Sequence, residues 1–302
     1  MAYRVRMIVR VSGHLQFRIP HSEFRITFGG TMDFYQKNNS IILHQPDFAL
    51  DDTLDCGQAF RWIKSAPDEY RGAFLNTPLT IRCLDQSDGV FELLDTTEQM
   101  FLDVWADYFD LATDYGELKR RYSEDETLAR ACAFAGGIRL LRQDAWEALS
   151  SFIISQNNNI PRIKGIIARL TEHYGGYPSA EQMSGETPET LAFLRSGFRA
   201  KYLTDAVAKV MSGEVSLERA RTLPTEEARA ELMKIKGVGV KVADCTLLFG
   251  LHRIEALPKD VWVKRVLAEW YPEGLPECVK GTEGIAQQYL FHYIRNKETI
   301  KV

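Results

Sequence analysis

The hydrophobic pattern of this sequence changes its period once, near residue 96, and that change constrains the fold more than any other feature. Residues 41–94 contain short alternating segments rich in β-forming side chains, with an Asp-Gly turn signal between two of them. Beyond them, apolar residues recur at helical spacing, beginning with Phe101, Val104, Trp105, Tyr108 and Phe109. We therefore expect an α+β chain that is mostly α, with an antiparallel sheet first and helices after it.

Three segments are predicted along the chain. Residues 1–31 hold five arginines and one glutamate, and they are either an extension upstream of a true start at Met32 or a flexible basic arm that touches DNA. Residues 32–125 are predicted as a β domain with a trailing helix, and residues 126–302 as a helical domain. Helices are expected at 144–156, from Ile160 to Gly175, and at 187–195, 202–211, 226–236, 240–251, 261–270 and 283–296.

Composition limits the partners of this chain. The formal net charge is −4, and −8 without residues 1–31, so the chain makes a poor indiscriminate binder of nucleic acid. DNA binding would have to rest on a local basic face or on backbone donors. No long apolar run or signal peptide is present, which favours the cytoplasm and excludes membrane partners. The five scattered cysteines form no CxxC pair, so we expect neither a disulfide framework nor a zinc or iron–sulfur cluster.

Residues 226–251 are typical of a helix, a tight KGVG bend and a second helix. Gly237 and Gly239 permit a bend whose backbone N–H groups point outward, next to the unpaired N–H groups of Val240 and its neighbours at the start of the second helix. Such a site could hold a DNA phosphate without using a charged side chain. A plain corner with glycine as a cap is equally compatible with the motif alone.

Lys241 lies in the first turn of that second helix. The positive end of the helix dipole and partial burial would both favour a neutral amine there. A neutral amine is a nucleophile, whereas an ordinary phosphate-binding lysine stays protonated. Cys245 shares the same helical face at i+4 and could form one wall for a flat ring.

Asp260 follows Pro258 and precedes an apolar helix, so it is predicted to cap that helix. The same carboxylate could help a lysine lose its proton and stabilise positive charge at a reacting sugar carbon. Asp244, three residues after Lys241, is the rival acid. We expect it to be a solvated or capping carboxylate instead.

Seven motifs occur in a fixed order. They are GQAFRW (57–62), RLLRQD (139–144), SQNNNIPRI (155–163), GFRAKY (197–202), GVGVKVADC (237–245), PKDVW (258–262) and AQQYLF (286–291). With them, about residues 40–296 resemble the helix-hairpin-helix DNA glycosylases, and more closely the eukaryotic-type 8-oxoguanine DNA glycosylases in a bacterial version. The resemblance implies a TBP-like antiparallel β domain packed on two helical subdomains, with the active site in the cleft between them.

The resemblance also implies roles for individual residues. Lys241 would attack C1′ of a flipped 8-oxoguanine nucleotide and form a Schiff base that breaks the strand by β-elimination, with Asp260 as the acid/base. The implied base pocket is Cys245 and Phe291 on the two faces of the base, Gln287 at its pairing edge, and the carbonyl of Gly57 at N7. The implied DNA contacts are Asn157, Arg162 and Arg199 at the orphaned cytosine, Phe198 in the vacated stack, the hairpin residues Gly237, Gly239 and Val240, and Trp262 in place of a phosphate-binding histidine.

The implied partner is double-stranded DNA containing oxidised guanine, bound by a monomer without a cofactor in the bacterial nucleoid. Two other functions stay open. A monofunctional alkylbase glycosylase would need only the aspartate and a water, which Lys241 argues against. A non-catalytic DNA-binding module would use the hairpin only to hold phosphate. Taken one by one, Phe291, Phe198 and Cys245 could also be core residues, Gln287 a surface residue, and the two arginines general phosphate ligands.

Overall fold

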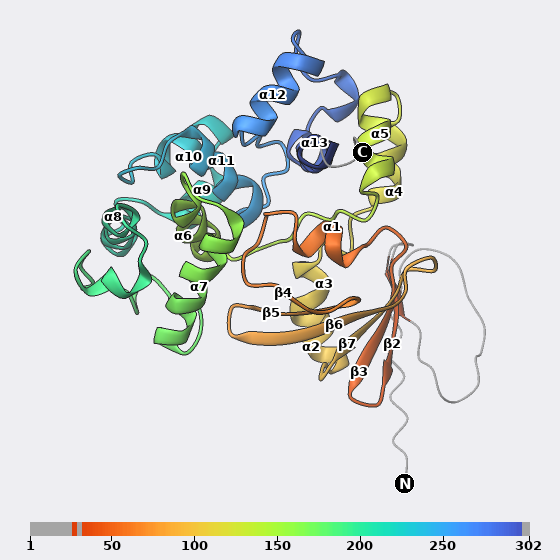
Figure 1. Ribbon diagram of the computed structural model, residues 1–302, viewed down its shortest axis with the longest axis horizontal. Coiled ribbons are helices and arrows are strands. Elements are labelled where there is room, and N and C mark those ends of the chain that lie inside the picture. The colour runs from red at the N-terminus through yellow and green to blue at the C-terminus, as the bar shows by residue number, and fades with distance from the viewer. Residues whose placement is uncertain (1–25, 29–31, 298–302) are drawn as a thin grey trace.

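A seven-stranded antiparallel sheet forms the first part of the computed structural model, which describes residues 26–28 and 32–297. The strand order is β1-β2-β3-β7-β6-β5-β4 (Figure 1). The strands are β1 (Ile26–Phe28), β2 (Met32–Lys37), β3 (Ser40–His44), β4 (Ile63–Ala66), β5 (Glu69–Phe74), β6 (Thr77–Asp85) and β7 (Val90–Leu94). The predicted sheet is therefore confirmed, and it includes two strands earlier than the sequence pattern indicated.

The predicted leader, residues 1–31, lies largely outside the described residues. Only residues 26–28 of it are described, and they pair with β2 as the short edge strand β1. Its assignment as an extension or as a basic arm stays a prediction.

One face of the sheet is covered by the helical stretch α2 (Glu98–Met100), η1 (Phe101–Trp105) and α3 (Ala106–Tyr108), in which η1 is π-helical. Phe101, Trp105, Tyr108 and Phe109 are buried against the sheet, as their spacing predicted, while Val104 is only partly buried. Trp62 lies in the middle of this core and donates through Nε1 to the Tyr108 hydroxyl at 2.8 Å. The short helix α1 (Leu50–Leu54) lies on the way from β3 to β4.

The remaining helices share a second, larger core. They are α4 (Tyr115–Tyr122), α5 (Glu126–Phe134), α6 (Ala145–Ser155), α7 (Ile160–Tyr174), η2 (Thr190–Leu194), α8 (Arg199–Met211), α9 (Leu217–Thr222), α10 (Thr225–Leu232), α11 (Val240–Cys245), η3 (Thr246–Gly250), α12 (Val261–Trp270), η4 (Glu277–Val279) and α13 (Glu283–Lys297). Helix α13 packs on α5 and α12, whereas α6 to α11 form a separate group (Figure 1). No helix among the described residues is long and apolar enough to cross a bilayer.

The predicted helices differ from the structure mainly at their ends. The expected helix at 187–195 is a single 3₁₀ segment, η2, and α8 begins at Arg199, three residues before its predicted start. Helix α9 was not predicted, although the Ser216 side chain caps it by accepting from Arg219 N at 3.1 Å. These differences arise because short helices depend on tertiary packing more than on local propensity.

Helix α6 runs through the centre of the helical core, and its residues 145–154 are all buried. Asp144 caps it by accepting from the backbone N of Trp146 and Glu147, at 3.0 and 2.9 Å. The Asp144-x-x-Glu147 spacing is that of a capping box, but only half of the box forms, because the Glu147 side chain binds Arg61 instead of returning to the cap. Helix α7 starts after the Asn159 cap and stops at Gly175, whose φ of 70° only glycine adopts readily.

Candidate active site

The hairpin between α10 and α11 requires glycine at position 237, whereas position 239 is open. Gly237 has a φ of +79°, and a Cβ there would lie 2.4 Å from a ring carbon of Tyr202. Gly239 precedes α11 as its N-cap without any side-chain cap, and nothing lies within 4 Å of the position of its missing Cβ. The first turn of α11 is therefore open toward solvent at Val240, which is 49% exposed. Such an end can accept an anion.

Lys241 projects from that turn beside an aromatic ring. Its Nζ lies 5.2 Å from the centroid of the Phe152 ring on α6. Cys245, one turn later, is buried, and burial raises the pKa of its thiol to about 11. The Lys241 amine opposes this rise in the pKa of Cys245, and the Asp260 carboxylate adds to it. The amine, the thiol and the carboxylate thus act on one another at a single place.

Asp260 caps α12, as predicted. Its Oδ1 accepts from the backbone N of Trp262 at 2.9 Å and of Val263 at 2.8 Å. Within the described residues, Oδ2 accepts no hydrogen bond, so it remains available to the cleft. The two backbone donors fix the orientation of the carboxylate at the start of α12.

A cleft of about 640 Å³ opens above these groups, and a smaller pocket of about 50 Å³ lies beneath it. Four predicted site residues line both spaces: Lys241, Asp260, Gly57 and Phe291. Cys245 and Gln287 line only the inner pocket, whereas Asn157, Gly239 and Trp262 line only the outer cleft. Segments far apart in the sequence therefore converge on one site.

Gln287 lies in the inner pocket with the oxygen of its side-chain amide unpaired among the described residues. Its side chain is buried, and its Oε1 accepts no hydrogen bond within the described part of the chain. An unpaired buried amide oxygen costs about 1–3 kcal/mol, which a ligand donor could recover. The alternative in which Gln287 is a surface residue is therefore wrong, because α13 turns this side chain inward.

Comparison with known proteins agrees with this geometry. Residues 40–149 match the family model of the 8-oxoguanine DNA glycosylase N-terminal domain, and residues 150–277 match that of the HhH-GPD superfamily of base excision DNA repair proteins. The N-glycosylase/DNA lyase OGG1 of Arabidopsis thaliana is 30% identical over 259 residues, which are 76% of this chain and 67% of that protein. This chain belongs to the 8-oxoguanine DNA glycosylase family.

Two solved structures of the family resemble the chain throughout its fold. The Clostridium acetobutylicum 8-oxoguanine glycosylase/lyase, in complex with double-stranded DNA containing cytosine opposite 8-oxoguanine, is 34% identical with a TM-score of 0.80. The alignment covers 89% of this chain and 98% of that one. MBOgg1, in complex with a low-affinity DNA ligand, is 37% identical with a TM-score of 0.82, over 89% of this chain and 99% of the other. The sheet and helical subdomains expected from the resemblance are those of the family.

The residues expected to contact the orphaned cytosine and to fill the vacated stack differ in how exposed their side chains are. Asn157 is exposed and has a φ of 46°, Arg162 is exposed, and Phe198 is 47% exposed. Arg199 is buried, and its guanidinium donates to the carbonyl oxygens of Gln156 and Asn157, each at 2.8 Å. Arg199 therefore holds the turn that carries Asn157, and its contact with a cytosine stays a prediction.

Asp244 corrects one expectation about this glycosylase. It is neither solvated nor a cap, because its side chain is buried and accepts from Arg229 Nε on α10 at 2.6 Å. Burial raises the pKa of Asp244, and the Arg229 pair opposes that rise. Asp244 lines neither the cleft nor the pocket, so it ties the two hairpin helices together.

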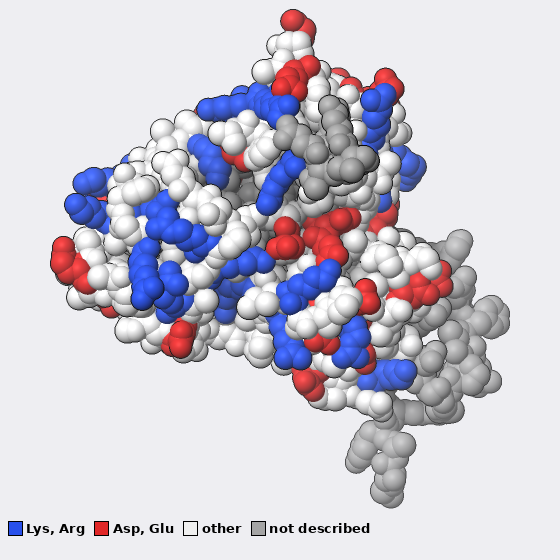
Figure 2. Space-filling view, viewed as in Figure 1, with Lys and Arg blue, Asp and Glu red and all other residues white. Residues whose placement is uncertain are grey.

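The sequence pattern missed several members of the site. Phe152 belongs to the helix expected at 144–156 and was given no place in the site, yet it lines both spaces beside Lys241. Lys259, Lys264 and Arg295 also line the cleft, and none of them pairs with a carboxylate in the described residues. Figure 2 shows Lys and Arg side chains spread over the helical part of the same face, beside an acidic patch. This local basic face can attract DNA despite the net charge of −4.

Proposed function

We propose that this chain is a base-excision-repair DNA glycosylase that flips 8-oxoguanine out of duplex DNA, preferably opposite cytosine, releases the base and cleaves the strand. The observation that carries the proposal is the convergence of Lys241, Asp260 and the unpaired Gln287 amide on one pocket. The pocket therefore offers a nucleophile, a charge that stabilises the reacting sugar and a polar group for the base.

The proposed reaction has three steps, which are attack on the sugar, opening of the sugar ring and elimination. The Lys241 amine forms a bond to C1′ while the C1′–N9 bond breaks, and a proton of the attached amine passes to the departing base. The C1′–O4′ bond then breaks as the nitrogen forms a double bond to C1′, and O4′ takes up a proton from water, giving a Schiff base between Lys241 and C1′. Removal of a C2′ proton breaks the C3′–O bond and releases the 3′ phosphate, which nicks the strand. Asp260, fixed by its two cap hydrogen bonds, stabilises positive charge at C1′ through its free oxygen.

The inner pocket would distinguish 8-oxoguanine from guanine. Its 50 Å³ hold only about three or four water molecules, so the pocket must widen when a purine enters. Phe291, which is only partly buried, and Cys245 on α11 both line this pocket. The carbonyl of Gly57 would accept the N7 hydrogen that 8-oxoguanine has and guanine lacks. An unmatched acceptor would cost about 1–3 kcal/mol, which supports rejection of the normal base.

The DNA would be held by the basic face and by backbone donors. Gly237, Gly239 and Val240 would bind one phosphate at the open end of α11, and Trp262 would lie along the strand at the cleft rim. Phe198 would fill the vacated stack, and Asn157, Arg162 and Arg199 would read the orphaned cytosine. Because Arg199 already binds carbonyl oxygens, it would exchange at least one of them for the base.

The relatives support the substrate. The Clostridium acetobutylicum protein is an 8-oxoguanine glycosylase/lyase in complex with DNA that contains cytosine opposite the lesion. We therefore assign this chain the same substrate class, acting as a monomer without a cofactor on the nucleoid DNA of a bacterial cytoplasm.

One incubation tests the proposal. The protein is mixed with a duplex containing 8-oxoguanine opposite cytosine, and borohydride is added to trap a Schiff base. A covalent adduct that Lys241→Gln abolishes, together with a loss of base release of about a thousandfold or more, is the expected result. Base release without an adduct would indicate the alkylbase type, and binding alone would indicate a DNA-binding module. Lys280→Gln, which removes an exposed charge of a surface ion pair, is the control.

A further inference from the structure

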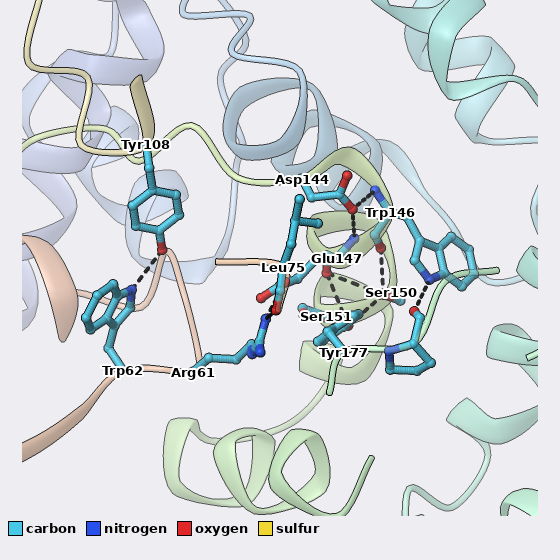
Figure 3. A network of polar contacts seen from close by, with 11 residues as sticks. Arg61, Trp62, Leu75, Tyr108, Asp144, Trp146, Glu147, Ser150, Ser151 and Tyr177 are labelled. Carbon is cyan, nitrogen blue, oxygen red and sulfur yellow. Dashed lines mark hydrogen bonds and ion pairs between the residues drawn. The ribbon is translucent and has the colours of Figure 1, made fainter. Parts of the chain in front are cut away.

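A buried ion pair joins the sheet domain to helix α6. Arg61 Nη1 lies 2.9 Å from Glu147 Oε2, and each side chain is only 11% exposed (Figure 3). Arg61 belongs to the segment 57–62, which leads from the cleft into the sheet, and Glu147 lies in the first turn of α6. The assigned reaction gives neither residue a part.

Arg61 stands where the two hydrophobic cores meet. The preceding residue, Phe60, is part of the helical core, while the following residue, Trp62, is part of the sheet core. The chain bends at Phe60 and Arg61 before β4 begins, which lets the Phe60 and Trp62 side chains enter different cores. Any displacement of Arg61 would therefore shift both cores relative to each other.

Further contacts hold Arg61 on three sides. Its Nη1 also donates to the carbonyl oxygen of Leu75 in the turn between β5 and β6, at 2.8 Å. Its guanidinium lies 5.4 Å from the centroid of the Tyr177 ring, and the Tyr177 hydroxyl bonds Ser150 Oγ on α6 at 2.7 Å (Figure 3). The guanidinium is thereby fixed against the sheet, against α6 and against the segment that follows α7.

The same segment and the same helix form the wall behind the nucleophile. The ring of Phe60 packs edge-on against that of Phe152, with 5.7 Å between centroids. Phe152 lies further along α6 from Glu147, and its ring faces Lys241 Nζ at 5.2 Å. Gly57, at the other end of the segment, lines both the cleft and the inner pocket. The ion pair therefore connects the two parts that enclose the reacting sugar.

The Arg61–Glu147 ion pair contributes little to the stability of the fold, because burying its two charges is costly. Burial raises the pKa of Glu147 to about 7 although Arg61 opposes the rise, so desolvation outweighs the attraction of the pair. Replacing such a buried pair by apolar side chains of similar size is often neutral or stabilising. Stability alone therefore does not account for two charges at this interface.

We propose that Arg61 and Glu147 are positioning residues that set the place of segment 57–60 against the Phe152 wall, and so the approach of the lesion to Lys241. The role rests on the proposed function, and it concerns the chemical step rather than DNA binding. Neither side chain touches the substrate, and the pair acts through Phe60 and Phe152.

Two sets of variants test the role. The double variant Arg61→Met with Glu147→Leu keeps the volume of the pair and removes both charges, so we expect it to fold. Single-turnover base release should fall about tenfold to a hundredfold while the Kd for duplex DNA changes by less than about threefold. Arg61→Lys, which keeps a cation for Glu147, should recover part of the rate. Glu277→Gln, at an exposed pair, should match the wild type.

Two outcomes would overturn the role. A folded double variant that releases base at the wild-type rate shows that the pair does not set the site. A double variant that fails to fold, or that loses DNA affinity in proportion to its rate, shows that the pair holds the fold instead.

A readout without the lesion separates this role from the proposed function. Amide hydrogen exchange of residues 56–60, followed by mass spectrometry, should be faster in the double variant than in the wild type. If the wild type releases no 8-oxoguanine, the proposed function fails. The positioning role is then still decided by two measurements, the amide exchange rates and borohydride trapping on an abasic-site duplex. Unchanged exchange and trapping would overturn it.

Discussion

The Nζ of Lys241 lies 5.2 Å from the centre of the Phe152 ring, which is itself stacked on Phe249 with 5.1 Å between centroids. An aromatic stack thus backs the amine on one side and leaves the pocket on the other. The face of an aromatic ring attracts a cation. The ring can therefore hold the Lys241 side chain in place before DNA binds and set the direction from which its nitrogen approaches the pocket.

Phe152→Leu should slow the chemistry more than it weakens binding. Loss of the ring leaves Lys241 without its wall, so single-turnover base release should fall about tenfold or more with little change in Kd. The smaller side chain should lower the free energy of unfolding by about 1–2 kcal/mol, because the site lies in the packed core. Phe193→Leu, at a ring stacked on His173, is the control. An unchanged rate would show that the stack does not orient the amine.

Asp260→Asn and Asp260→Ala should separate the two roles of this carboxylate. Asparagine caps helices as well as aspartate does, so Asp260→Asn should keep the thermal stability of the protein. Alanine should lower the free energy of unfolding by about 1 kcal/mol, because Trp262 N and Val263 N lose their acceptor. Both variants should lose base release by about a hundredfold or more in single-turnover assays. An active Asp260→Asn would reduce Asp260 to a cap.

Asp244→Asn should have the opposite profile. Its carboxylate pairs with Arg229 away from the cleft, so removing the charge should lower the free energy of unfolding by about 1–3 kcal/mol. Base release at a temperature where the variant is fully folded should stay near that of the wild type. Denaturant unfolding and single-turnover assays measure the two effects. Loss of turnover in Asp244→Asn while Asp260→Asn stays active would reverse the assignment of the acid.

The stability of the protein should depend on Glu147 near neutral pH. Burial raises the pKa of Glu147 from 4.5 to about 7, with Asp144 adding to the rise and Arg61 opposing it. Folding therefore favours the protonated form, and the stability from this group is complete below pH 4.5 and lost as the pH rises through 7. The neighbouring Tyr177 stays neutral in this range, since burial and Glu147 raise its pKa.

Urea unfolding at pH 5 and pH 8 measures this effect. From pH 5 to pH 8, the unfolding free energy of the wild type should fall by about 2 kcal/mol relative to that of Glu147→Gln. Glu277→Gln, at an exposed ion pair, should show no such change relative to the wild type. A pH-independent difference for Glu147→Gln would contradict the raised pKa.

Local signals in the sequence determined much of this protein. The order of the seven motifs indicated the family, the change of period placed the sheet before the helices, and the glycines of the hairpin put Lys241 in the first turn of α11. The capping role of Asp260 was also predictable, because a cap depends on backbone groups two or three residues away.

Only the tertiary structure decided which side chains meet. Phe152 beside Lys241, Asp244 beside Arg229, Arg199 against the Gln156 and Asn157 carbonyls, and Arg61 beside Glu147 are contacts between different elements. Their burial and pairing depend on how helices and sheet pack, and packing places together residues as far apart in sequence as Arg61 and Glu147. A local pattern identifies a residue that can carry chemistry, whereas the surroundings that make it reactive are supplied by distant parts of the chain.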